Sequence, residues 1–165
     1  MIDRAVLEAI FEGAPGFLAR LDAAGPFATS DELFDTARGI AHSMPEPDQV
    51  ELVDSHPRLG APPGTVSAMS YREQGYDRAA GTDLATELEQ LNDAYEARFG
   101  FRYCVFVAGR SRAELLPGMT AALDADRDTE LHRALDAVID IAIDRHASPH
   151  APTRRHDRPI AEARP

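Results

Sequence analysis

Apolar residues recur at helical spacing along almost all of this 165-residue chain. The clearest stripe lies over residues 84–99 and stops at Gly100, a residue type that commonly ends helices. Only residues 101–108 form a short, β-like apolar run, and no second run of that kind offers it a partner. A lone strand cannot form a sheet, so this run is predicted to be buried extended chain or helix. The pattern therefore predicts an all-α fold.

Two serines are predicted to begin helices because a glutamate follows each of them three residues later. Ser70 with Glu73, and Ser111 with Glu114, have the capping-box spacing, in which both side chains bind backbone N–H groups of the first turn. Residues 57–69 contain prolines and glycines and are predicted to form a loop. Together with the apolar stripes, these signals predict roughly seven to eight short helices in a single domain.

The predicted domain covers residues 1–146, and its last helix runs from about residue 129 to residue 145. Residues 147–165 hold prolines, histidines and arginines and show no apolar periodicity. Such a segment has too little apolar surface to offset the entropy of ordering it. We therefore expect residues 147–165 to be a disordered, basic tail.

The composition limits the possible classes of function. All 17 basic residues are arginine, so chemistry that needs a lysine Schiff base or a P-loop lysine is excluded. The net charge of −11 argues against a nucleic-acid partner, since phosphate binding requires a basic surface. No apolar stretch is long enough to span a membrane, and no signal peptide is evident. Cys104 is the sole cysteine, which fits a reducing compartment, so we expect a cytoplasmic protein without membrane contact.

His56 is the main candidate for chemistry. Pro57 biases it away from helical geometry, so the imidazole is predicted to lie at a helix end. A serine, a carboxylate and an amide follow at Ser70, Glu73 and Gln74, and together these groups are the parts of a proton-transfer site. Each also has a purely structural interpretation, as a histidine bound to a carbonyl or as the capping box described above. No metal-binding spacing accompanies His56.

Two arginines are candidates for holding an anionic ligand. Arg145 ends the last predicted helix, and Arg110 follows the apolar run directly after a glycine. Arginine binds carboxylates through two parallel hydrogen bonds, which suits an acidic ligand. The alternative for Arg145 is simply a cation that complements the helix dipole.

The order of these motifs resembles the family of 2-oxo-4-hydroxy-4-carboxy-5-ureidoimidazoline (OHCU) decarboxylases. The matching segments begin with Ser55-His56-Pro57-Arg58-Leu59-Gly60 and Ser70-x-x-Glu73-Gln74. They continue with Leu91-Asn92-x-Ala94-Tyr95-x-x-Arg98-Phe99-Gly100-Phe101 and close with Ala134-Leu135…Ile141-Ala142…Arg145. The resemblance covers about residues 5–146, and the combination in this order is more specific than any single motif.

The resemblance implies an all-α homodimer that uses neither metal nor organic cofactor. It implies a carbon–carbon lyase that converts OHCU, a small molecule, to (S)-allantoin in urate catabolism, with the substrate's ring carbonyl accepting the electron pair. His56 and Glu73 would be catalytic, with His56 as the acid/base. The substrate-binding residues would be Pro57, Ser70, Gln74, Phe101, Val105, Val107 and Arg145, with backbone groups of residues 101–107 bonded to the ring.

The chain also departs from the family pattern. The loop over residues 60–66 reads Gly-Ala-Pro-Pro-Gly-Thr-Val, Gly75-Tyr76-Asp77-Arg78 follows Gln74, and the N-terminal motifs are altered. These departures leave two alternatives. One is a non-catalytic helical binding or interaction module of the same ancestry, and the other is a decarboxylase that acts on a related heterocycle.

Overall fold

The computed structural model describes residues 2, 4–61, 63–74 and 82–148. Within those residues it has eight α-helices, one 3-10 turn and no strand, so the predicted all-α fold is confirmed. In chain order the elements are α1 (Arg4–Ile10), α2 (Pro15–Ala24), α3 (Ser30–Ser43), α4 (Glu46–Asp54), η1 (Pro63–Thr65), α5 (Ala68–Glu73), α6 (Thr82–Phe99), α7 (Arg112–Ala122) and α8 (Arg127–Ala147).

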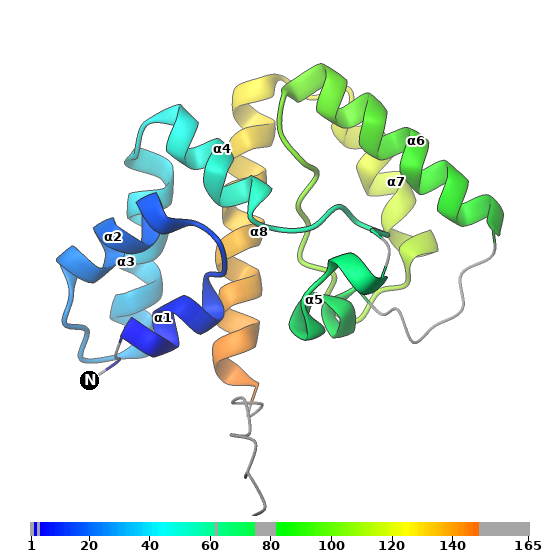
Figure 1. Ribbon diagram of the computed structural model, residues 1–165. Coiled ribbons are helices and arrows are strands. Elements are labelled where there is room, and N and C mark those ends of the chain that lie inside the picture. The colour runs from blue at the N-terminus through cyan, green and yellow to red at the C-terminus, as the bar shows by residue number, and fades with distance from the viewer. Residues whose placement is uncertain (1, 3, 62, 75–81, 149–165) are drawn as a thin grey trace, which may run out of the picture.

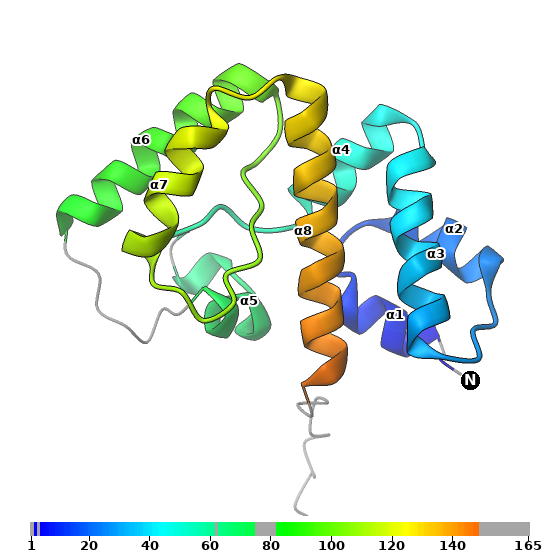
Figure 2. The same ribbon diagram turned by 180° about the vertical axis from the view of Figure 1, so that it is seen from behind.

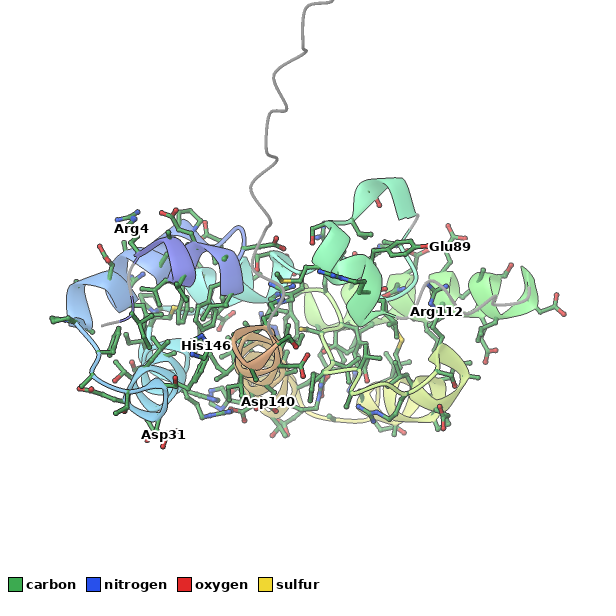
Figure 3. All side chains as sticks on the ribbon, turned by 90° about the horizontal axis from the view of Figure 1, so that it is seen from below. Arg4, Asp31, Glu89, Arg112, Asp140 and His146 are labelled. Carbon is green, nitrogen blue, oxygen red and sulfur yellow. The ribbon has the colours of Figure 1, made fainter. Side chains whose placement is uncertain are left out.

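Helix α8 stands between two groups of helices, with α1–α4 on one side and α5–α7 on the other (Figure 1, Figure 2). It packs against α3, α4 and α1 on the first side. Figure 3 looks along α8, where His146 points toward α3. The His146 Nε2 atom there lies 2.9 Å from the Ser30 hydroxyl oxygen. Helix α8, the longest of the described helices, thus lies between two halves of the molecule, α1–α4 and α5–α7.

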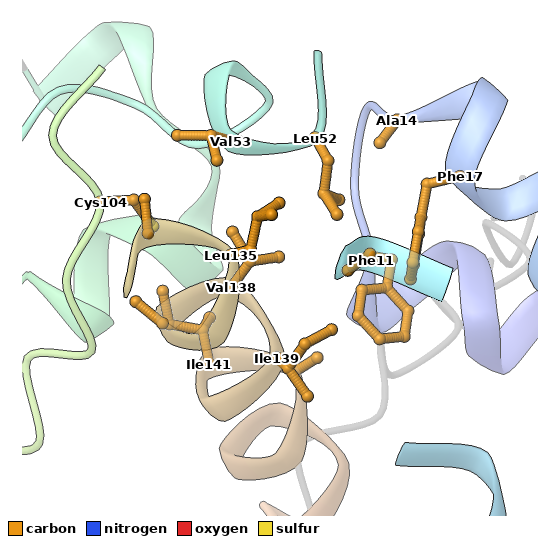
Figure 4. Packing of buried hydrophobic residues seen from close by; sticks show 14 of the residues in the cluster. Phe11, Ala14, Phe17, Leu52, Val53, Cys104, Leu135, Val138, Ile139 and Ile141 are labelled. Carbon is orange, nitrogen blue, oxygen red and sulfur yellow. The ribbon is translucent and has the colours of Figure 1, made fainter. Parts of the chain in front are cut away.

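The core follows from the sequence of α8, which is apolar on more than one face. Figure 4 shows Ile139 beside Phe11 and Phe17, whereas Ile141 lies on the side of Cys104. All five side chains are buried, and a helix with apolar residues on opposite faces has to be covered from both sides. Burying each large side chain of this kind stabilises the fold by about 1.5–3 kcal/mol.

The apolar run after α6 is neither helix nor strand. Residues 102–107 form an extended segment that passes between α8 and the pair α6 and α7 (Figure 1). Tyr103, Cys104 and Val107 are buried in it, as is Phe101 directly before it. Of the two predicted forms, buried extended chain or helix, the segment adopts the extended one, and it reaches the part of the molecule that holds the candidate site.

One of the two predicted capping boxes is wrong. Helix α5 begins at Ala68, and its N-cap is Ser67, whose hydroxyl accepts a hydrogen bond from the Ser70 N–H at 3.1 Å. The nearer serine takes the cap because the chain is extended at Ser67 (ψ 158°) and helical from Ala68 onward. Ser70 is thus released from capping. The second box, at Ser111 and Glu114, is confirmed with both of its hydrogen bonds.

The last helix begins two residues earlier than predicted. Asp126 caps α8 by accepting a hydrogen bond from the Thr129 N–H at 2.9 Å, so Thr129 lies inside the first turn. The predicted tail, residues 147–165, lies almost wholly outside the described residues, as do the departures at residues 75–78. In the described part of the chain, no helix has the length and apolar character needed to cross a membrane.

Candidate active site

A cavity of about 420 Å³ lies beside the lower half of α8. Four parts of the chain line it: residues 56–59 after α4, residues 69–74 in and after α5, the extended segment over residues 103–110, and residues 141–148 of α8. These segments are drawn from residues 56–148 of the sequence. The cavity therefore forms only when α5 and the extended segment pack beside α8.

His56 lies at the cavity wall two residues beyond the end of α4, and thus at a helix end as the sequence predicted. Its side chain has one of two nitrogen atoms engaged: Nδ1 lies 3.3 Å from the Ser55 hydroxyl oxygen. That hydroxyl donates its proton to the Leu52 carbonyl at 2.7 Å, so toward the imidazole it can only accept. Nδ1 therefore carries the ring proton, and Nε2 keeps its lone pair. The buried Nε2 has no hydrogen-bond partner among the described residues.

Burial disfavours the charged form of this imidazole. Desolvation and the nearby positive charge of Arg145 together lower the pKa of His56 from 6.5 to about 4, although a hydrogen bond to the backbone at Leu52 acts in the opposite direction. Near neutral pH, His56 is consequently a neutral imidazole with a free lone pair. Such a group is suited to accept a proton from a ligand in the cavity.

Arg145 lines the cavity from α8, and its side chain is 2% exposed. Its Nη1 donates to the Ile10 carbonyl at 3.2 Å and lies 3.7 Å from the Glu12 carboxylate. The same carboxylate oxygen accepts a hydrogen bond from Ser67, the N-cap of α5, at 3.2 Å. Glu12 thus connects the arginine with α5. The sequence offered no signal for this role, since Glu12 stands alone between α1 and α2.

Ser70 and Gln74 both line the cavity, but the Ser70 hydroxyl and the Gln74 amide have different hydrogen-bond partners. Ser70 is 3% exposed, and its hydroxyl has the Ser67 hydroxyl as a neighbour at 3.2 Å. The Gln74 amide accepts from the Gly60 N–H at 2.8 Å and donates to the Arg58 carbonyl at 3.1 Å. Gln74 therefore fastens the loop that follows His56 to the end of α5.

Further bonds hold that loop from the other side. Arg58 forms a two-pronged ion pair with Glu96 on α6, both contacts at 2.7 Å. Asn92 on α6 donates to the Leu59 carbonyl at 2.9 Å, and Arg102 donates to the His56 carbonyl at 3.2 Å. The backbone around His56 is consequently fixed by α5, α6 and the extended segment together.

Most of the predicted site residues meet at this cavity. Pro57, Val105 and Val107 line it, whereas Phe101 does not and packs instead against Tyr95 and Phe99. Arg110 lies at the cavity, and its guanidinium donates to the carbonyls of Phe106 and Val107. Glu73 is the last residue of α5, and its side chain lies outside the described part of the structure. Its predicted catalytic role stays a prediction.

The lining also contains residues that sequence reasoning did not select. Met69 and Arg72 come from α5, and Asp144 from α8. Nothing in the sequence distinguishes them from ordinary helix residues. Among the described residues, no three His, Cys, Asp or Glu side chains are grouped as metal ligands.

Comparison with known proteins places this arrangement in a family. The family model for OHCU decarboxylase matches residues 3–147. The chain is 32% identical over 139 residues to the uric acid degradation bifunctional protein PucL of Bacillus subtilis, covering 82% of this chain but 28% of that protein. It is 27% identical over 135 residues to the OHCU decarboxylase of Haloferax volcanii, covering 81% and 80% of the two chains.

A solved structure has the same fold. A crystal structure of an OHCU decarboxylase in the presence of (S)-allantoin superposes with a TM-score of 0.68 and 24% identity, over 86% of this chain and 95% of that one. The chain spans less than a third of the bifunctional relative, but most of the Haloferax protein. Because the family model covers nearly the whole described structure, the chain belongs to the OHCU decarboxylase family.

Proposed function

We propose that this protein is a lyase that decarboxylates OHCU to (S)-allantoin in the breakdown of urate. The observation that carries the proposal is the Nε2 of His56, which has no hydrogen-bond partner among the described residues and is a buried, neutral base at the wall of a cavity that Arg145 also lines. Membership of the OHCU decarboxylase family supports the choice of substrate. The cavity of about 420 Å³ has room for a five-membered ring with its substituents.

The reaction needs one broken bond and two proton movements. The carboxylate leaves as CO₂, and the electron pair of the broken bond moves into the ring, where the ring carbonyl shares the charge. A proton from solution neutralises the ring. The hydroxyl proton on the former carboxyl-bearing carbon then moves to the neighbouring, ureido-bearing carbon, which gives allantoin. Because the ring itself accepts the electron pair, we propose that no cofactor takes part.

His56 can perform the second proton movement. Its Nε2 accepts the hydroxyl proton and, as the imidazolium, returns it to the adjacent carbon. Delivery from one fixed side gives a product of one hand. An imidazolium whose pKa lies below 6.5 gives up its proton readily, which favours the return step.

The remaining groups hold the substrate. Arg145 supplies a positive charge for the carboxylate or the ureido oxygen, and Ser70 supplies a hydroxyl on the opposite helix. We retain Glu73 as a second catalytic carboxylate because it follows Ser70 by one helical turn on α5. We also retain two further expectations: the homodimer that the family resemblance implies, and the cytoplasmic location expected from the sequence itself. Light scattering of the purified protein tests the first.

A coupled assay tests the proposed reaction. Urate is oxidised by uricase, the product is opened by hydroxyisourate hydrolase, and circular dichroism follows (S)-allantoin. We expect rapid formation of a single enantiomer, which His56→Asn lowers by at least about 100-fold, in the range for loss of a general acid–base. His132→Asn, an exposed histidine of α8 outside the cavity, is the control. Slow, racemic product with the wild-type protein would overturn the proposal.

A further inference from the structure

A buried polar network joins α6 and α8 beside the extended segment. Glu130 on α8 is 2% exposed and accepts a hydrogen bond from the Tyr95 hydroxyl at 2.6 Å. Arg133, one turn further on, donates to both oxygens of Glu130 at 2.6–2.9 Å. Burial, with the hydrogen bond to Glu130, raises the pKa of Tyr95, so its hydroxyl keeps its proton. The carboxylate is thereby fully occupied by one hydroxyl and one guanidinium.

The remaining guanidinium nitrogen of Arg133, Nη1, contacts the wall of the cavity. Its Nη1 donates to the Cys104 carbonyl at 3.0 Å, and its guanidinium lies over the Tyr103 ring, 5.0 Å from the centroid. Tyr103 and Cys104 both line the cavity, whereas Arg133 does not. The network therefore acts on the wall from outside, through the backbone of the extended segment.

That contact fixes the orientation of one peptide group. In a trans peptide the carbonyl of one residue and the N–H of the next point in opposite directions. Since the Cys104 carbonyl is directed at Arg133, the Val105 N–H is directed away from it. Val105 lines the cavity, and among the described residues its N–H donates no hydrogen bond. An unused donor in the wall of a cavity can bind a ligand oxygen.

We propose that Arg133, held by Glu130 and Tyr95, is a positioning residue that orients the Cys104–Val105 peptide so that the Val105 N–H binds an oxygen of the substrate ring. This inference rests on the proposed function for the identity of the substrate. Arginine suits the task because its planar fork bonds Glu130 and the carbonyl at the same time, in a fixed geometry. A lysine has all its donors on one nitrogen, so it cannot reproduce two contacts that Arg133 makes from separate nitrogens of a planar group.

The chain contains a closely matched control. Arg127 also belongs to α8, donates to a backbone carbonyl, that of Phe99, at 2.9 Å, and lies over the ring of Phe101 at 5.6 Å. Neither Phe99 nor Phe101 lines the cavity. Arg127→Lys and Arg133→Lys therefore remove the same kind of contact, and only Arg133→Lys acts on the cavity wall.

The experiment measures turnover of OHCU and the amide signal of Val105 in full-length protein labelled with ¹⁵N-valine. For Arg133→Lys we expect KM to rise about tenfold, equivalent to about 1.4 kcal/mol, with kcat within about twofold, since the bond holds ground and transition states alike. Arg127→Lys leaves KM unchanged. Tyr95→Phe, which keeps Arg133 and loosens only its anchor, raises KM by about threefold and provides a milder variant if Arg133→Lys does not fold.

The amide signal separates this inference from the proposed function. Adding (S)-allantoin is expected to shift the Val105 amide proton downfield in the wild type and in Arg127→Lys, but not in Arg133→Lys. If the wild type does not turn over OHCU, the proposed function fails, and the response of Val105 to (S)-allantoin still decides the inference. An unresponsive Val105 amide in the wild type, or equal KM values for the two lysine variants, overturns it.

Discussion

At the scale of single residues, the surroundings of His56 determine the charge and the tautomer of its imidazole. Imidazole is the usual proton carrier near neutral pH, but a surface imidazole would be partly charged there. Burial at the end of α4 keeps this one neutral, and the Ser55 hydroxyl fixes which nitrogen carries the proton. The sequence identified the residue, whereas its tautomer and its charge depend on contacts that only the folded chain has.

The same burial makes His56 a source of acid sensitivity. Its pKa is about 4 in the folded protein and near 6.5 in the unfolded chain, so between these values the unfolded chain binds the extra proton. Stability therefore falls as the pH drops from 6.5 toward 4, and at pH 5 the loss from this group is about 2 kcal/mol. We expect urea unfolding to show a steeper decline from pH 7 to pH 5 in the wild type than in His56→Asn. Parallel declines would contradict the assigned burial effect.

At the scale of elements, α5 depends on its neighbours. Six residues are too few for a helix that is stable by itself. Its N-cap, Ser67, also donates to Glu12, and Gln74 at its other end bonds the loop after His56. We call these two contacts, Ser67 with Glu12 and Gln74 with the loop, the anchors of α5. The order of the side chains that α5 places at the cavity therefore depends on both anchors.

Removing the first anchor is expected to affect binding as well as stability. Ser67→Ala loses the cap and the link to Glu12, so the protein should lose about 1 kcal/mol and KM for OHCU should rise severalfold. Ser111→Ala removes a comparable cap from α7, which does not line the cavity, and should cost similar stability without changing KM. Urea unfolding and steady-state kinetics check both variants. A KM for Ser67→Ala equal to that of Ser111→Ala would contradict this role for α5.

Short elements are also where sequence reasoning reached its limit. The long stripe of α6 and the box at Ser111 were predictable, since apolar periodicity and local capping carry them. At α5 two serines competed for one cap, and no local rule ranks Ser67 above Ser70. The roles of Glu12 and Glu130 were not predictable, because Glu12 binds Ser67 and Glu130 binds Tyr95, and both partners lie more than thirty residues away in the chain.

At the scale of the whole molecule, α8 joins two halves that share no other long helix. Leu135 and Ile139 are fully buried in the centre of α8, and the halves pack on opposite faces of this helix (Figure 4). A core that is shared in this way should make the molecule unfold in one cooperative step. Separate halves would instead lose structure at different denaturant concentrations.

The tyrosines allow that prediction to be tested without added labels. The chain has no tryptophan, and its four tyrosines, Tyr71, Tyr76, Tyr95 and Tyr103, all belong to the part of the sequence after α4. Tyrosine fluorescence therefore reports that half, whereas far-ultraviolet circular dichroism reports the helices of both. We expect the two urea transitions to coincide in the wild type. Leu135→Ala should move both to lower urea together, with a loss of about 2–5 kcal/mol, because a cavity in α8 weakens the wall that both halves use. Two separated transitions in either protein would mean that the halves fold independently and that α8 belongs to only one of them.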